Sequence, residues 1–157
     1  MNGMNWDEYF IKMAELTASK SKDRSTKVGA VLVGPGHTVL GIGFNGFPRG
    51  VNDDVDARHE RPLKYSITEH AERNAVYNAA RNGIKLEGVT MYVTGGCGAC
   101  ADCARAIIQS GIAELVGMDA AFEGKGNWAE SIAIGKEMMR EAGVKLTRNK
   151  VREKTIA

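Results

Sequence analysis

Apolar residues near the N-terminus recur with the period of a helix. Asn5 and Glu8 stand in the two positions of a capping box, so the pattern predicts an amphipathic helix over residues 5–20. We expect the aromatic-rich stripe of this helix to pack into the core. The stripe consists of Trp6, Tyr9, Phe10, Met13 and Leu16.

Two β-rich segments follow, and together they predict a hairpin. Residues 28–33 and 38–44 read as strands, and Gly34-Pro35-Gly36 between them is a strong turn signal. Residues 45–61 contain Gly, Pro and several Asp residues and predict an irregular loop. An irregular loop of this length is more often functional or mobile than neutral.

The rest of the chain alternates between helical and extended patterns. One helix is predicted from its cap, Thr68, to Asn82, and another from Cys100 to Gly111. The last helix is predicted to follow the cap Asn127, with Glu130 in the capping-box position, and to end at Ala142. Strands are predicted over residues 89–94, 112–118 and 144–147.

This order of elements predicts one α/β domain. Strands that alternate with helices favour a layered fold in which helices cover both faces of the sheet. The strand–helix–strand crossover over residues 89–118 makes part of the sheet parallel. We expect residues 1–147 to form a single domain and the charged residues 148–157 to form a frayed tail.

Composition and charge argue against several classes of protein. The chain has 157 residues and a formal net charge of only +2, which gives no electrostatic case for binding nucleic acid or an anionic membrane. No apolar run approaches the roughly 20 residues that span a bilayer, and the N-terminus lacks the apolar core of a signal peptide. We therefore expect a cytoplasmic protein.

Candidate chemistry is concentrated in two short motifs. His70-Ala71-Glu72 lies at the start of one predicted helix, and Cys100-Ala101-Asp102-Cys103 opens another. One imidazole and two thiolates are good zinc ligands, and three protein ligands leave a fourth position open, as in catalytic zinc sites. The positive end of a helix favours thiolates over thiols. His70, Cys100 and Cys103 are therefore predicted to hold one zinc ion.

Glu72 stands two residues from a predicted zinc ligand, where a free carboxylate can carry protons. It can take a proton from zinc-bound water and deliver it to a ring nitrogen and then to a leaving amine. Backbone N–H groups at Ala71 and Cys100 can bind the hydroxide and the developing charge. This combination matches the H-x-E and C-x-x-C signature of zinc nucleobase deaminases and predicts a hydrolytic deaminase.

Cys97 complicates the choice of ligands, because it forms a second, overlapping C-x-x-C pair with Cys100. A closed site with Cys97 as fourth ligand would be structural rather than catalytic. Cys97 lies in a glycine-rich loop, whereas Cys103 lies within the predicted helix. We favour Cys100 and Cys103 as the ligands and keep a non-catalytic zinc module as an alternative.

With these motifs, the chain resembles the cytidine deaminase superfamily and, within it, the deoxycytidylate (dCMP) deaminases. The resemblance runs from about residue 6 to residue 144, and residues 44–50 (Phe-Asn-Gly-Phe-Pro-Arg-Gly) resemble the dCMP branch in particular. The other segments that carry it are Ser21-Lys22-Asp23, Val28-Gly29-Ala30, Lys64-Tyr65, residues 70–75 and residues 100–112.

The resemblance implies a three-layer α/β/α sandwich with a five-stranded mixed sheet. It implies zinc-dependent hydrolysis of dCMP to dUMP and ammonia, which feeds dTMP synthesis. Glu72 would be the proton shuttle, and Asn45 would hold the sugar or the edge of the base. The resemblance also implies a homo-oligomer (a hexamer, otherwise a dimer or tetramer) that dCTP with Mg²⁺ activates and dTTP inhibits. Asn45, Gly46 and Arg49 are candidate contacts for such an effector.

The contacts to the substrate rest on fewer residues. Phe122 is a candidate for stacking on the pyrimidine, with core packing as its alternative. The family usually has proline where Arg24 and Ala99 stand, and Arg24 leaves the number of phosphates open. The same chemistry on dCTP, a 5-modified dCMP, or a free base or nucleoside is therefore an alternative. The candidates for holding a phosphate are Lys20, Lys22, Arg24 and Arg49.

Overall fold

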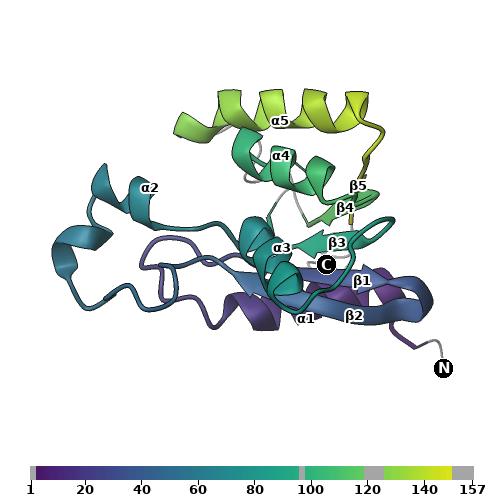
Figure 1. The fold of residues 1–157 in the computed structure, drawn as a ribbon, viewed down its shortest axis with the longest axis horizontal. Coiled ribbons are helices and arrows are strands. Elements are labelled where there is room, and N and C mark those ends of the chain that lie inside the picture. The colour runs from purple at the N-terminus through teal and green to yellow at the C-terminus, as the bar shows by residue number, and fades with distance from the viewer. Residues whose placement is uncertain (1–2, 96–97, 119–125, 150–157) are drawn as a thin grey trace, which may run out of the picture.

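A computed structural model places five strands in one mixed sheet, in the order β2-β1-β3-β4-β5 (Figure 1). The structure describes residues 3–95, 98–118 and 126–149. β1 pairs antiparallel with both β2 and β3, whereas β3–β4 and β4–β5 are parallel pairs. The strands are β1 (Gly29–Gly34), β2 (Thr38–Phe44), β3 (Thr90–Val93), β4 (Glu114–Gly117) and β5 (Lys145–Arg148).

Helices cover both faces of this sheet, which confirms the three-layer α/β/α fold (Figure 1). One face packs against α1 (Trp6–Ala18), through a core cluster that includes Phe10 and Val31. The other face packs against α3 (Ala71–Arg81), α4 (Ala101–Gln109) and α5 (Ala129–Glu141). No helix among the described residues is long and apolar enough to cross a membrane.

The face that α1 buries differs from the predicted aromatic stripe. Asn5 caps the helix as predicted, because its side chain accepts a hydrogen bond from the Glu8 N–H at 2.8 Å. Phe10 is buried, but Trp6 is 53% exposed and Leu16 is 73% exposed. A Cβ added at Gly29 of β1 would overlap the backbone of α1 at Ala14. At Gly29 the helix therefore lies so close to the strand that only its small residues fit there, while Phe10 packs into the core as predicted.

Two helix starts also differ from the predicted ones. Thr68 does not cap α3: it ends α2 (Leu63–Ile67), a short helix that the sequence pattern did not indicate, and His70 is the N-cap of α3. Between α2 and α3 the chain is extended, and reciprocal backbone hydrogen bonds join Glu69 of this stretch to Gly46. Asn127 lies within a 3-10 helix, Gly126–Trp128, and does not cap α5.

The 45–61 segment, which was predicted to be irregular, contains a short 3-10 helix, Asp56–His59. Another 3-10 helix, Pro35–His37, connects β1 and β2 in the hairpin. β5 runs to Arg148, one residue beyond the predicted strand and into the predicted tail. Residues 150–157 of that tail lie outside the described residues.

Backbone contact at Gly43 sets the position of α3 on the edge strand β2. A Cβ added at Gly43 would overlap the backbone nitrogen of Ala75 and lie 2.5 Å from the carbonyl oxygen of Ala71. We expect Gly43→Ala to lower the free energy of unfolding by about 1–3 kcal/mol, because the added methyl pushes the helix off the sheet. Urea unfolding of the purified variant measures this loss.

The matched control for this change is Gly3→Ala. A Cβ added at Gly3 meets no heavy atom within 4 Å among the described residues, so the stability should stay within about 0.5 kcal/mol of the parent protein. A Gly43→Ala protein as stable as the control would contradict the close approach of α3 to β2.

Candidate active site

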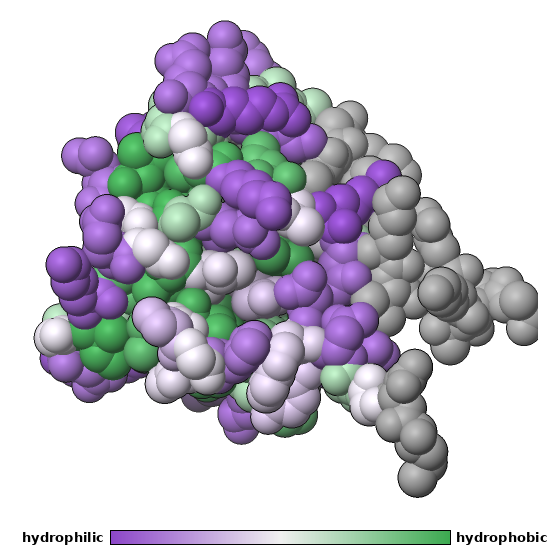
Figure 2. Space-filling model, turned by 90° about the vertical axis from the view of Figure 1, so that its right-hand side faces the viewer, coloured by the Kyte–Doolittle hydropathy of each residue, from purple (hydrophilic) through white to green (hydrophobic). Residues whose placement is uncertain are grey.

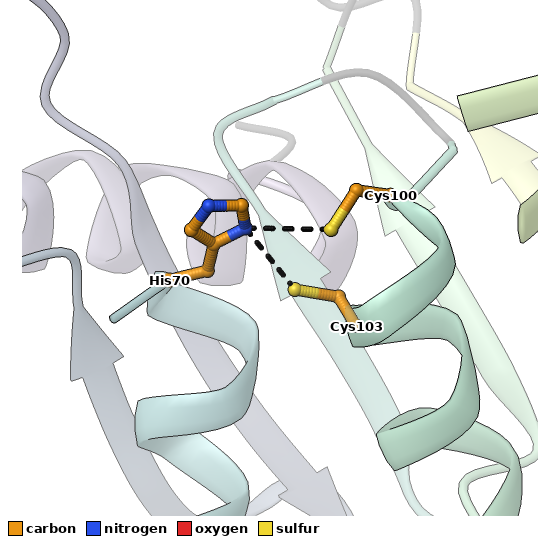
Figure 3. A group of neighbouring side chains, drawn as sticks. All are labelled: His70, Cys100 and Cys103. Carbon is orange, nitrogen blue, oxygen red and sulfur yellow. Dashed lines mark hydrogen bonds between the residues drawn. The ribbon is translucent and has the colours of Figure 1, made fainter. Parts of the chain in front are cut away.

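The N-terminal ends of α3 and α4 face each other and bring the two predicted motifs together (Figure 3). His70 is the N-cap of α3, Cys100 is the N-cap of α4, and Cys103 lies in the first turn of α4. The His70 side chain makes no capping hydrogen bond to α3, so it is available for other partners. The fold thus joins residues that are 30 or more positions apart in the chain.

The three predicted zinc ligands form a compact cluster. His70 Nδ1 lies 3.4 Å from Cys100 Sγ and 3.3 Å from Cys103 Sγ. All three ligand atoms lie within 4.8 Å of one another, and both cysteines are buried. Within residues 3–95, 98–118 and 126–149, these side chains are the group placed to share one metal ion. One imidazole and two thiols are a donor set that suits zinc.

The two cysteines of the cluster share a proton unequally. Hydrogen bonds from Cys103 and His70 lower the pKa of Cys100 to about 4, although burial opposes this change. The pKa of the Cys103 thiol is raised, because it donates to Cys100 and is itself buried. The hydrogen bond to Cys100 also raises the pKa of His70. One thiolate is therefore already favoured at neutral pH, which suits the binding of a cation.

Glu72 lies beside the cluster in the first turn of α3. Its Oε2 is 3.7 Å from Cys103 Sγ. Burial raises the pKa of the Glu72 carboxyl, while the neighbouring His70 acts in the opposite direction. A carboxyl group in such surroundings can hold a proton as well as release it, which is what a proton carrier requires.

An ion-pair chain ties the two helix starts together. The Arg73 guanidinium pairs with Glu69, and its Nη1 lies 3.3 Å from Asp102 Oδ2 in the first turn of α4. Asp102 also pairs with Arg105. Arg73 is mostly buried whereas Asp102 is 57% exposed, so this link is a partly solvated ion pair between the starts of α3 and α4.

A cavity of about 230 Å³ opens beside the cluster. The predicted residues His70, Ala71, Glu72 and Cys100 line it, and so does Asn45. The Asn45 amide holds the neighbouring loop, because its Oδ1 accepts from the Val28 N–H and its Nδ2 donates to the Thr26 carbonyl, both at 2.8 Å. Asn45 thus connects the wall of the cavity to the start of β1.

The predicted phosphate contacts lie elsewhere. Lys22 Nζ pairs with Asp53 at 2.8 Å, and Arg24 pairs with Asp56 at 2.9 Å, and both cations are mainly exposed. Neither residue lines the cavity. Phe122 and Cys97 lie outside the described residues.

The predicted effector residues are engaged with the scaffold. Gly46 pairs with Glu69 through the isolated β-bridge. The Arg49 guanidinium donates to Asn78 Oδ1 of α3 at 2.6 Å. These contacts attach the 45–50 loop to the helix that carries His70.

The cavity also contains charged residues that the sequence analysis did not assign to the site. Lys64 Nζ lies 2.9 Å from Asp23 Oδ1 and 3.3 Å from Ser25 Oγ. Burial opposes ionisation of Asp23, but hydrogen bonds from backbone N–H groups and from Lys64 hold its pKa below the ordinary value. Arg61 lines the same cavity and donates to the Tyr65 hydroxyl at 2.8 Å.

Aromatic rings form another part of the cavity wall. Trp128 lies edge-on to His70, with ring centroids 5.3 Å apart, and edge-on to Tyr65, at 5.8 Å. The dipeptide Lys64-Tyr65 was visible in the family resemblance, but nothing in the sequence indicated that α2 would bring it, or Trp128, to the zinc motif.

Residues 4–119 match the family model described as the cytidine and deoxycytidylate deaminase zinc-binding region. The chain therefore belongs to this family, and it is a hydrolytic deaminase with a zinc-binding site. A deaminase from the luxG 3′ region of Aliivibrio fischeri is 41% identical over 142 residues, covering 90% of this chain and 92% of that protein.

Relatives of known name are deoxycytidylate deaminases. The enzyme of Mus musculus is 36% identical over 146 residues, which cover 90% of this chain and 78% of that protein. The enzyme of phage T2 is 33% identical and covers 87% of this chain and 88% of its own. The crystal structure of dCMP deaminase from cyanophage S-TIM5 in apo form has a TM-score of 0.70 at 25% identity, covering 91% of this chain and 96% of that one.

Measurements of zinc content can test whether Cys97 is a zinc ligand. We expect Cys100→Ala to abolish stoichiometric zinc binding, because it removes one of three ligands, whereas Cys97→Ala should keep one zinc per chain. Elemental analysis of both purified variants gives the two values, and circular dichroism checks that both have folded. Loss of zinc in the Cys97→Ala protein would indicate a closed four-ligand site instead.

Proposed function

We propose that the protein hydrolyses dCMP to dUMP and ammonia. The observation that carries this proposal is the His70, Cys100 and Cys103 cluster with the Glu72 carboxyl beside it, at the wall of a cavity. Relatives named deoxycytidylate deaminase, including those of mouse and phage T2, support dCMP as the substrate.

His70 Nδ1 and the sulfurs of Cys100 and Cys103 are the proposed zinc ligands. Zinc bound by this donor set supplies the Lewis acidity that makes water a nucleophile near neutral pH. The low pKa of Cys100 favours one thiolate before any metal binds, and Cys103 would give up its thiol proton to become the second sulfur ligand.

Glu72 is the proposed proton carrier. The carboxylate takes one proton from the attacking water and delivers it to the ring nitrogen next to the reacting carbon. It then takes the remaining proton from the added hydroxyl and delivers it to the amine, which leaves as ammonia while the carbonyl of the product forms. Its raised pKa fits this role, since the same group must be a base in one step and an acid in the next.

The start of α3 also offers a hydrogen-bond donor for the base. Ala71 is the first residue of the helix and lines the cavity, so its N–H has no partner within the helix. We assign this N–H to an oxygen of the substrate. Asn45 is assigned to the sugar or the edge of the base, because one N–H of its amide remains after the bond to Thr26.

The phosphate is proposed to lie at the end of the cavity that Arg61 and Lys64 line. A guanidinium and an ammonium are the two side-chain cations that bind phosphate best. Lys64 keeps a third N–H after its contacts with Asp23 and Ser25. Of the four candidates that the sequence offered, Lys22 and Arg24 each pair with an aspartate outside the cavity, and neither Lys20 nor Arg49 lines it.

Assembly and regulation stay predictions. A homo-oligomer covers exposed apolar surface. The edge strand β2 exposes apolar side chains, including Ile42 and Phe44, and Figure 2 shows apolar groups between polar ones on one face of the molecule. Control by dCTP with Mg²⁺ and by dTTP at the 45–50 loop, and a cytoplasmic location, likewise stay predictions.

Deamination of dCMP tests the proposal directly. We expect the zinc-loaded protein to release ammonia and dUMP, and Glu72→Gln to lower kcat by roughly 10²–10⁴-fold, because the amide cannot carry a proton. Glu72→Gln should still hold one zinc per chain. Absence of turnover with dCMP in the parent protein, or an active Glu72→Gln protein, would refute the assignment.

A pair of variants locates the phosphate. We expect Arg61→Gln to raise the KM for dCMP by roughly tenfold, the loss of about 1.5 kcal/mol for one hydrogen bond to a charged group, while turnover of deoxycytidine stays unchanged. Lys22→Gln, the matched control, should leave both substrates unaffected. If Lys22→Gln raised the KM and Arg61→Gln did not, the phosphate would lie at the exposed pair.

A further inference from the structure

Trp128 lies at a helix position where its side chain cannot make the usual capping hydrogen bond. It is the N-cap of α5, and it makes no side-chain capping hydrogen bond. Ser, Thr, Asp and Asn are preferred at this position, because their oxygens accept from the free N–H groups of the first turn. A tryptophan there gives the helix no such bond. A residue that breaks a local rule in this way marks a place where another requirement prevails.

The surroundings of Trp128 show what that requirement is. The side chain is 39% exposed, so core packing does not hold it in place. It lines the cavity together with Ile132, one turn further along α5. The Trp128 and His70 rings meet at 67° with centroids 5.3 Å apart, and the Tyr65 ring stands at 82° to Trp128. The rings of Trp128 and His70 therefore form an aromatic corner beside the metal-binding cluster.

We propose that Trp128 is a substrate-positioning residue, whose indole ring packs against the pyrimidine base bound at the cluster. The inference rests on the proposed function, because it takes the ligand to be a pyrimidine deoxynucleotide. A flat base with one carbon at the cluster lies in the corner that the two rings form. An aromatic face next to a base is a strong and orientation-dependent contact, and it excludes water from the reacting edge.

Trp128→Ser separates a substrate role from a structural one. Serine is a preferred N-cap, so the melting temperature should stay the same or rise by about 2 °C. The KM for dCMP should rise by roughly 10- to 100-fold, as for the loss of an aromatic stacking partner, while kcat changes by less than about threefold. Zinc content should remain one per chain.

Two further variants frame this measurement. Trp128→Phe keeps an aromatic face and should recover most of the lost affinity for dCMP. Trp6→Ser makes the same chemical change in the other tryptophan of the chain, which lies at the start of α1, stacked on His37 and outside the cavity lining. It should leave the KM for dCMP unchanged.

Fluorescence reports the contact without turnover. The chain has two tryptophans, so Trp6→Phe leaves Trp128 as the single indole emitter. Titration of that protein with dUMP should give a saturable change in emission. The same titration of Trp128→Phe, which keeps only Trp6, should give none.

Three other outcomes would contradict the inference, and they can be told apart. A KM for Trp128→Ser within about twofold of the parent, or an emission that ignores dUMP, removes the contact with the base. Loss of zinc or a lower melting temperature in Trp128→Ser would make Trp128 a support for His70 or for the fold. A parent protein that fails to deaminate dCMP overturns the proposed function, and this inference with it.

Discussion

The candidate site depends on the direct contact of the α3 backbone with the edge strand β2. Glycine at position 43 leaves no side chain of its own between β2 and the α3 backbone at the fully buried alanines 71 and 75. This backbone contact fixes the start of α3 on the sheet, and it thereby fixes the positions of His70 and Glu72. α4 follows β3, which is separated from β2 by β1, and its start lies beside that of α3, where the Arg73–Asp102 ion pair links the two helices. A metal cluster formed from two separate helices needs such rigidity.

The chemistry of the site follows from buried charges at two helix starts. Two thiols and an imidazole within hydrogen-bond reach make one thiolate favourable, and burial of Glu72 keeps its carboxyl ready to take up a proton. The same principle organises the far end of the cavity, where the buried Lys64–Asp23 pair joins α2 to the loop before β1. The backbone N–H groups of Ser25 and Thr26 donate to the same Oδ1 of Asp23 that Lys64 contacts, and these hydrogen bonds stabilise the charged form of the buried carboxylate.

Part of the fold could be read from the sequence, because periodicity and glycine signals are local. The strands and the helices α1, α3, α4 and α5 were predicted, with errors at Thr68 and Asn127, whose capping roles depend on contacts made elsewhere. Thr68 does not cap α3, because the Gly46–Glu69 bridge keeps the chain extended up to His70. The buried face of α1 was predicted only in part: Phe10 and Met13 pack into the core as expected, whereas Trp6 and Leu16 are exposed, and the close approach at Gly29 requires small residues.

The sequence by itself determined the metal chemistry, because the two short motifs that contain His70, Glu72, Cys100 and Cys103 supply all the donor groups, and the fold then brings the two motifs together. Only the tertiary structure decided what surrounds the metal. Charge alone could not distinguish Lys22, which pairs with Asp53 at the surface, from Lys64, which lines the cavity. Trp128 reaches the cavity only because α5 packs beside α4. Such contacts join residues far apart in the chain, and no local pattern records them.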